Sequence, residues 1–173
     1  MDEETHGLQA SLARGDEAAF QAAYDRHGRT LYRAAWRILG NATDAEDAVQ
    51  DVFSALAAGR RGLRSVKDLG AYLFVSLRRA AWRIAQRRAR QPQGPCVSDP
   101  PAAPAAAEPL EAGRLQAALT RLPGPQREVL ALKIDGELTF AQIGDVLGVS
   151  PNTAASRYRY ALETLRGLLE CDT

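Results

Sequence analysis

The sequence predicts an all-α protein built from two small helical domains joined by an extended linker. Along most of the chain, apolar residues recur at spacings of three, four or seven, the period of a helix with one buried face. No alternating run supports a strand. Residues 91–109, QPQGPCVSDPPAAPAAAEP, lack this period and are rich in Pro, Ala and Gly, which is typical of a semi-rigid linker. The predicted domains are therefore residues 8–90 and 110–170, the second containing a helix-turn-helix.

The first domain is expected to contain three helices. The first covers about residues 16–39 and ends at Gly40-Asn41. Thr43-Asp44-Ala45-Glu46 has the form of a capping box, which predicts that the second helix begins near Asp44. A third helix is expected over about 67–90, after a Gly/Arg-rich turn. The face of the first helix expected to be buried consists of Phe20, Tyr24, Leu31, Ala35 and Ile38.

The second domain is expected to contain four shorter helices, over 110–122, 125–135, 140–147 and from 151 to about 169. Pro123-Gly124 ends the first of them. Thr139 is placed to cap the third, and Gly148 supplies the left-handed turn after it. Ser150-Pro151 then caps and opens the last helix, because proline suits a first-turn position.

The formal net charge of +1 conceals an uneven distribution. Residues 1–90 hold 15 Lys/Arg and 11 Asp/Glu, whereas residues 91–173 hold 7 and 10. Proteins that bind DNA alone usually carry a strong basic surface. This chain is therefore expected either not to bind DNA or to bind it alongside another protein.

The chain is expected to work in the cytoplasm. Its acidic N-terminus does not resemble a secretory signal, and no apolar run approaches the roughly 20 residues that span a bilayer. Its two cysteines, Cys96 and Cys171, have no partners at metal-ligand spacing. Nothing resembles a nucleophile–base pair, a phosphate-binding glycine loop or a zinc site, so neither an enzyme nor a cofactor is expected.

The strongest local motif is residues 139–160, TFAQIGDVLGVSPNTAASRYRY, which has the pattern of a helix-turn-helix. Gly144 suits a close helix crossing and Gly148 suits the tight turn between the helices. The second helix of such a motif presents its first turns to a major groove, where Arg suits guanine or phosphate and Asn suits adenine. A plain helical hairpin with a solvated polar face is the alternative. The candidate DNA-binding residues are Asn152, Thr153, Ser156, Arg157 and Arg159.

The third predicted helix is strongly basic towards its end and carries aromatic residues. No acidic residue lies between Val75 and Arg90. Basic side chains interleaved with aromatic ones suit a DNA backbone and unstacked bases. Such a helix end can also simply complement the helix dipole, and each aromatic residue by itself is better explained as part of the core. The candidate DNA-binding residues are Tyr72, Arg78, Arg79, Trp82, Arg83, Arg87 and Arg88.

The second predicted helix has the opposite charge. Carboxylates beside a narrow apolar stripe suit a basic partner helix, although acids early in a helix also stabilise its N-terminus. No His or Cys lies nearby, and the spacing matches no calcium loop, so a metal is not expected. The candidate partner-binding residues are Asp44, Glu46, Asp47, Gln50 and Asp51.

In this order, the three features resemble the sigma-70 family in its compact, two-domain extracytoplasmic-function (ECF) form. NATDAEDAVQDVFSAL resembles the helix that binds core RNA polymerase, and DLGAYLFVSLRRAAWRIAQRRAR resembles the helix for promoter melting and −10 recognition. The last 50 or so residues resemble the −35-binding domain. The resemblance implies a sigma factor that binds core polymerase and directs promoter-specific initiation.

The resemblance also implies a role for each set of residues. The acidic set of the second helix would contact the coiled-coil helices of the polymerase β′ subunit, and the linker would thread towards the RNA-exit and active-site region. The basic set of the third helix would lie along −10 DNA, and the set in the last helix would face the −35 element. An anti-sigma factor covering the same surfaces is a further expected partner, and no membrane insertion is expected.

The chain departs from the family pattern at three points. Arg79 and Arg83 stand where Asn and Asp are usual, Ala155 stands where Lys is common, and the second domain is acidic. A sigma factor need not hold DNA alone, because polymerase keeps both domains near the promoter. Two alternatives stay open: an adaptor that binds polymerase or an anti-sigma factor without reading DNA, and an independent helix-turn-helix regulator. Whether the two domains pack together is also left open.

Overall fold

The computed structural model describes residues 3–90 and 109–171, and the predicted all-α class is confirmed. The described residues form eight α-helices and one 3-10 helix and contain no strand. The predicted linker lies outside the described residues except for Pro109, which begins a helix. In chain order the elements are α1 (Glu3–Arg14), α2 (Glu17–Leu39), α3 (Ala42–Ala58), η1 (Arg60–Ser65), α4 (Leu69–Arg90), α5 (Pro109–Arg121), α6 (Gly124–Ile134), α7 (Phe140–Leu147) and α8 (Pro151–Cys171).

Helix α1 is an element that the sequence analysis did not predict. It packs against η1, and Leu12 is fully buried there. Gln9, which is also buried, donates a hydrogen bond from Nε2 to the carbonyl oxygen of Val66 at 3.2 Å. The helix therefore gains much of its stability from tertiary contacts, which a periodicity argument does not reveal.

The caps of α2 and α3 explain where these helices begin and end. Asp16 caps α2 by accepting a hydrogen bond from the Ala18 amide at 3.1 Å, and Gly40 ends it with a left-handed φ of 70°. The predicted capping box at Thr43 is wrong. Asn41 caps α3 instead, because its Oδ1 accepts from the Asp44 amide at 2.9 Å. The helix consequently starts two residues earlier than predicted.

Helices α7 and α8 form the predicted helix-turn-helix. Thr139 and Gln142 make a reciprocal capping box at the start of α7, and Gly148 ends it with a φ of 69°. Ser150 Oγ accepts from the Thr153 amide at 3.1 Å and so caps α8. At Gly144 a Cβ atom would lie 2.7 Å from the Val149 carbonyl oxygen, so only glycine allows the two helices to approach this closely.

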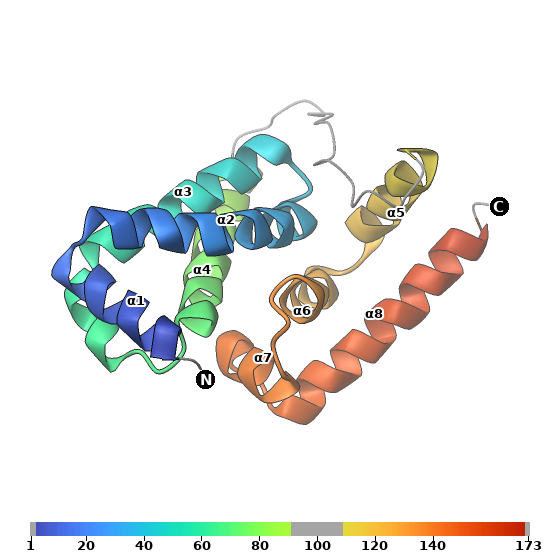
Figure 1. The fold of residues 1–173 in the computed structure, drawn as a ribbon. Coiled ribbons are helices and arrows are strands. Elements are labelled where there is room, and N and C mark those ends of the chain that lie inside the picture. Colours follow the sequence, from blue (N-terminus) through green and yellow to red (C-terminus); the bar gives the residue numbers. More distant parts are fainter. Residues whose placement is uncertain (1–2, 91–108, 172–173) are drawn as a thin grey trace.

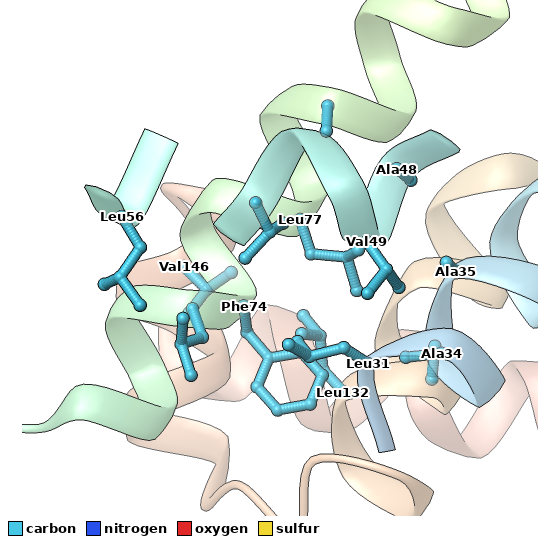
Figure 2. Packing of buried hydrophobic residues seen from close by; sticks show 14 of the residues in the cluster. Leu31, Ala34, Ala35, Ala48, Val49, Leu56, Phe74, Leu77, Leu132 and Val146 are labelled. Atoms are coloured by element: carbon cyan, nitrogen blue, oxygen red, sulfur yellow. The ribbon is translucent and has the colours of Figure 1, made fainter. Parts of the chain in front are cut away.

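The N-terminal helices α1–α4 and the C-terminal helices α5–α8 pack against each other. In Figure 1, α6 and α7 lie between the N-terminal helices and the long α8. Leu132 of α6 and Val146 of α7 belong to the same buried cluster as Leu31, Phe74 and Leu77 (Figure 2). A smaller cluster joins α5, α6 and α8 through Ala118, Leu119, Leu122, Leu130, Ala161 and Leu165. Helix α6 thus contributes to both clusters and connects the two halves of the protein.

The half-buried His27 on α2 is expected to make stability depend on pH. Burial and the positive charge of Arg26 lower its pKa below the ordinary 6.5, whereas Asp68 acts in the opposite direction. The stabilising effect of the neutral ring is therefore complete above about pH 6.5 and is lost as the pH falls through the folded-state pKa. Between about pH 7 and 5, the free energy of unfolding of the wild-type protein should fall more steeply than that of His27→Gln. Parallel curves from denaturant titrations would contradict this.

Candidate nucleic-acid interface

The predicted −35-reading side chains lie in the first three turns of α8. Asn152 and Arg159 are exposed, and the guanidinium of Arg159 lies 5.3 Å from the ring centre of Tyr160. The hydroxyl of Thr153 shares a 2.8 Å hydrogen bond with Ser150 and so takes part in the cap. Ser156 and Arg157 are half-buried. The structure therefore brings all five residues onto neighbouring turns, with Asn152 and Arg159 the most accessible to a ligand.

An aromatic contact that the sequence analysis did not single out helps to fix α8 against α7. The rings of Phe140 and Tyr158 lie 5.7 Å apart at an angle of 59°. Lys133 Nζ lies 5.1 Å from the Phe140 ring centre and donates a hydrogen bond to the Leu138 carbonyl at 3.0 Å. Ala154 is fully buried at the crossing of the two helices. These contacts set the angle at which the first turns of α8 project outward.

Of the arginines of α4 that were predicted to read the −10 element, three form ion pairs with other described residues and two do not. Arg83 and Arg88 form ion pairs with the acidic helix α3, to Asp51 at 3.3 Å and to Asp44 at 3.0 Å. Across to α6, Arg78 pairs with Glu128 at 3.4 Å. The other two, Arg79 and Arg87, are exposed and form no ion pair within the part of the chain that the structure describes.

The aromatic residues of α4 differ in their exposure. The sequence favoured a place in the core for each of these aromatic residues. Phe74 is indeed buried in the core, and Tyr72 is half-buried. Trp82 does not fit that expectation, because 61% of its surface is exposed. It helps to line an open groove of about 560 Å³ together with Tyr72, Ser76, Arg79 and other residues of α3, α4 and α6. Charged guanidinium groups beside an exposed indole are suited to an unstacked base and its phosphate.

The acidic face of α3 is only partly available to a partner. Glu46, Asp47 and Gln50 are exposed, whereas the carboxylates of Asp44 and Asp51 are engaged by the arginines of α4. The sequence analysis identified all five residues, but it could not show that two of them neutralise the neighbouring basic helix. The freely presented part of this face is therefore Glu46, Asp47 and Gln50.

A second groove borders this acidic face and contains residues that the sequence analysis missed. It measures about 540 Å³ and runs between α2 and α3. Tyr24 was expected on the buried face, but 52% of its surface is exposed, and its ring lies 5.0 Å from that of Phe53. On the same groove, burial and the nearby Glu46 raise the pKa of the Tyr32 hydroxyl. The spacing of apolar residues gave no signal that distinguished these tyrosines from core residues.

Family comparisons agree with the two halves of the fold. Residues 23–91 match the model for Sigma-70 region 2, and residues 112–165 match the model for Sigma-70, region 4. The ECF RNA polymerase sigma factor SigM of Mycobacterium tuberculosis is 31% identical over 163 residues, which cover 94% of this chain and 83% of that protein. The ECF RNA polymerase sigma factor SigK of Mycolicibacterium vanbaalenii is 30% identical over 175 residues, covering 96% and 89%.

Two solved structures have a similar arrangement. CnrH, in complex with the cytosolic domain of CnrY, is 27% identical with a TM-score of 0.72, covering 97% of this chain and 98% of that one. The sigma factor RpoE of Bartonella quintana, in complex with the anti-sigma factor NepR, is 24% identical with a TM-score of 0.75, covering 89% and 98%. The second likeness bears on the fold alone.

These findings establish the family. The chain belongs to the sigma-70 family, in its ECF group, and directs promoter-specific transcription initiation by RNA polymerase. Within the described residues, no helix is both long and apolar enough to cross a membrane. No group of His, Cys, Asp or Glu side chains in residues 3–90 and 109–171 is arranged to hold a metal ion.

Proposed function

We propose that the chain divides the work of initiation between its two halves, with residues 8–90 binding core polymerase and the −10 element and residues 110–170 binding the −35 element. The observation that carries this proposal is that three helices each present a different kind of surface. Helix α3 presents carboxylates, α4 presents arginines with an exposed indole, and α8 presents the first turns of a helix-turn-helix. No step of this role requires a catalytic group.

For core polymerase, the proposed contact is the acidic face of α3. Glu46, Asp47 and Gln50 are exposed there, and the groove beside them is lined by Tyr24 and Tyr32. A basic partner helix would meet carboxylates at the rim of the interface and aromatic rings beside them. Protein interfaces commonly combine a polar rim with aromatic residues.

For the −10 element, the proposed contacts centre on Trp82, Arg79 and Arg87. These three side chains are exposed, so they are available for DNA without breaking a contact within the protein. Arg83 and Arg88 would have to exchange the carboxylates of α3 for phosphates. Because both pairs are near the surface and screened by solvent, that exchange costs little.

For the −35 element, replacing Arg157 by alanine is expected to cost about 1–3 kcal/mol of binding free energy, the range for a side chain that contacts a base. The measurement is the relative rate of transcription from a cognate promoter and from variants with single −35 substitutions. The preference for one base pair over the others should be lost at a single position of the −35 element. Unchanged transcription and unchanged preference would remove Arg157 from the interface.

An anti-sigma factor is the further partner that we propose. CnrH is similar to this chain over nearly all of its length and was solved with the cytosolic domain of CnrY bound. A protein that covers the acidic face of α3 and the exposed indole of α4 would block polymerase and promoter together.

The experiment that tests the function is a mixture of the protein with purified core RNA polymerase, followed by transcription from a genomic promoter library. Stable association with new, discrete start sites is the expected result, and it would yield the −35 and −10 sequences together. Association without initiation would indicate an adaptor. If the free protein bound a DNA site but did not associate with core polymerase, it would be an independent regulator.

A further inference from the structure

One face of α4 forms the floor of a groove that has room for a single nucleotide. The groove measures about 560 Å³ and is walled by residues of α3 and α6. Pockets of about 300–1,000 Å³ hold drug-sized ligands, so a nucleotide fits in this groove and a duplex does not. A base can therefore enter it only when the base is unstacked and single-stranded. The residues of the floor recur at spacings of four and three and so share one side of the helix: Tyr72, Ser76, Arg79 and Arg83.

Three arginines line the groove, and their surroundings differ. Arg78 pairs with Glu128 at 3.4 Å, and Arg83 pairs with Asp51 at 3.3 Å. Arg79 is exposed and has no ion pair among the residues that the structure describes. Its guanidinium, which carries five N–H donors and no acceptor, can therefore bind a ligand without giving up a carboxylate.

The groove as a whole is only weakly charged. The carboxylates of Asp51 and Glu128 offset two of the three guanidinium charges, which leaves the charge of Arg79 uncompensated. Phosphates are attracted by clusters of uncompensated basic side chains, and a single charge supplies little of that attraction. An exposed indole is present instead, that of Trp82, on which a base can stack. The groove is therefore better suited to a base than to the DNA backbone.

An arginine beside an aromatic platform favours guanine. Arg79 and Trp82 are three positions apart on α4, which makes them neighbours on the helix surface. A base stacked on the indole would present its edge to the guanidinium, whose two parallel donors match O6 and N7 of guanine. Adenine and thymine do not offer two neighbouring acceptors on one edge. Unpaired cytosine offers O2 and N3, but its single ring covers less of the indole and so stacks less strongly.

We propose that Arg79 selects a guanine in the single-stranded part of the −10 element and that Trp82 is the platform on which this guanine stacks. The proposal rests on the function proposed above, which assigns the −10 element to α4. Position 79 is also a point at which the chain departs from the family pattern, where Asn is usual. Asn combines a donor with an acceptor and matches adenine, whereas Arg has donors alone and matches guanine. The departure therefore changes which base the groove can read.

The test measures the affinity of the free, full-length chain for fluorescent thymidine strands of about 12 nucleotides, a length within the range that such grooves bind. Each strand carries one central guanine, cytosine or adenine, or thymine throughout. The guanine strand should bind at least about fivefold more tightly than the others, the lower limit for a bidentate contact with a base. A strand with 7-deazaguanine, which lacks the N7 acceptor, should lose most of this advantage. Equal affinities, no measurable binding or a preference for another base would overturn the proposal.

The decisive variant is Arg79→Ala, which should bind the guanine and 7-deazaguanine strands equally. Arg87→Ala is the matched control, because it removes the same charge from the same helix and Arg87 does not line the groove. This control should weaken the binding of all strands by a similar factor and keep the preference for guanine. Trp82→Ala should weaken the binding of every strand, since stacking on an aromatic ring tolerates any base. A guanine preference that survived in Arg79→Ala would overturn the proposal.

The second readout is transcription by core polymerase from a promoter library with a randomised −10 element. With the wild-type chain, guanine should be favoured at one position, and with Arg79→Ala that preference should disappear while the −35 preference stays the same. Initiation without any guanine preference would overturn the inference and leave the proposed function standing. No initiation with the wild-type chain would overturn the proposed function and the assignment to the −10 element. The strand affinities, which require no polymerase, would then still show whether Arg79 selects guanine.

Discussion

Replacing Asp47 and Asp51 together by lysine is expected to abolish association with core RNA polymerase. Asp47 is exposed, and the Asp51 side chain keeps 44% of its surface accessible beside Arg83. A lysine at each position would face a basic partner with like charge, and such a juxtaposition costs several kcal/mol. A loss of at least about 100-fold in affinity should follow. The measurement is the dissociation constant for core polymerase, with circular dichroism to show that the helices remain.

The matched control for this prediction is Glu163→Lys with Glu170→Lys on α8. Both residues are exposed, and the substitution changes the net charge by the same amount, four units in each double variant. This control should bind polymerase nearly as well as the wild-type chain. Because Asp51→Lys also removes the pair with Arg83, Asp47→Lys alone provides a second test with that pair intact. Retained affinity in both α3 variants would show that polymerase binds elsewhere.

Replacing Gly144 by alanine should disable −35 recognition while leaving polymerase association intact. The added Cβ would lie 2.7 Å from the Val149 carbonyl oxygen, which is backbone and cannot rotate away. Helices α7 and α8 would be forced apart, at a cost of about 1–3 kcal/mol or more, as for other overpacked sites. We expect a lower unfolding temperature and a selective loss of −35-dependent transcription.

Gly167 provides the control for the alanine substitution. It lies within α8, and a Cβ there would meet nothing within 4 Å. Gly167→Ala should therefore stabilise the protein by about 0.5–1 kcal/mol, because alanine loses less backbone entropy than glycine in a helix. If Gly144→Ala proved as harmless as Gly167→Ala, the close crossing of α7 and α8 would not be needed for promoter recognition.

Much of the fold could be predicted because its signals are local. The period of the apolar residues in α2, α3 and α4, and the glycines at 40 and 148, mark the helices and their ends. Helix α1 escaped prediction because its stability depends on η1, more than 45 residues away in the sequence. The start of α3 was misplaced because Asn41 and Thr43 are both good caps, and only the backbone decides between them.

The candidate site was predicted as three sets of residues but without their mutual contacts. Periodicity shows which residues share a face, yet it does not show which neighbour covers that face, and so the exposure of Tyr24 and Trp82 was missed. The pairing of Arg37 with Asp135 joins residues 98 positions apart. No local pattern carries such information, and the packing of the two halves could not be foreseen.

With α3 assigned to polymerase and α4 to promoter DNA, as proposed above, the ion pairs between the two helices are expected to make polymerase binding and promoter binding cooperative. A basic partner that takes over Asp44 and Asp51 releases Arg88 and Arg83, so their positive charge becomes available to phosphates. By thermodynamic reciprocity, DNA that draws these arginines away raises the affinity of the carboxylates for the partner by the same factor. Because both pairs are solvent-accessible, each contributes at most about 1 kcal/mol, which corresponds to roughly fivefold. The protein would thus bind each ligand weakly alone and both together more tightly.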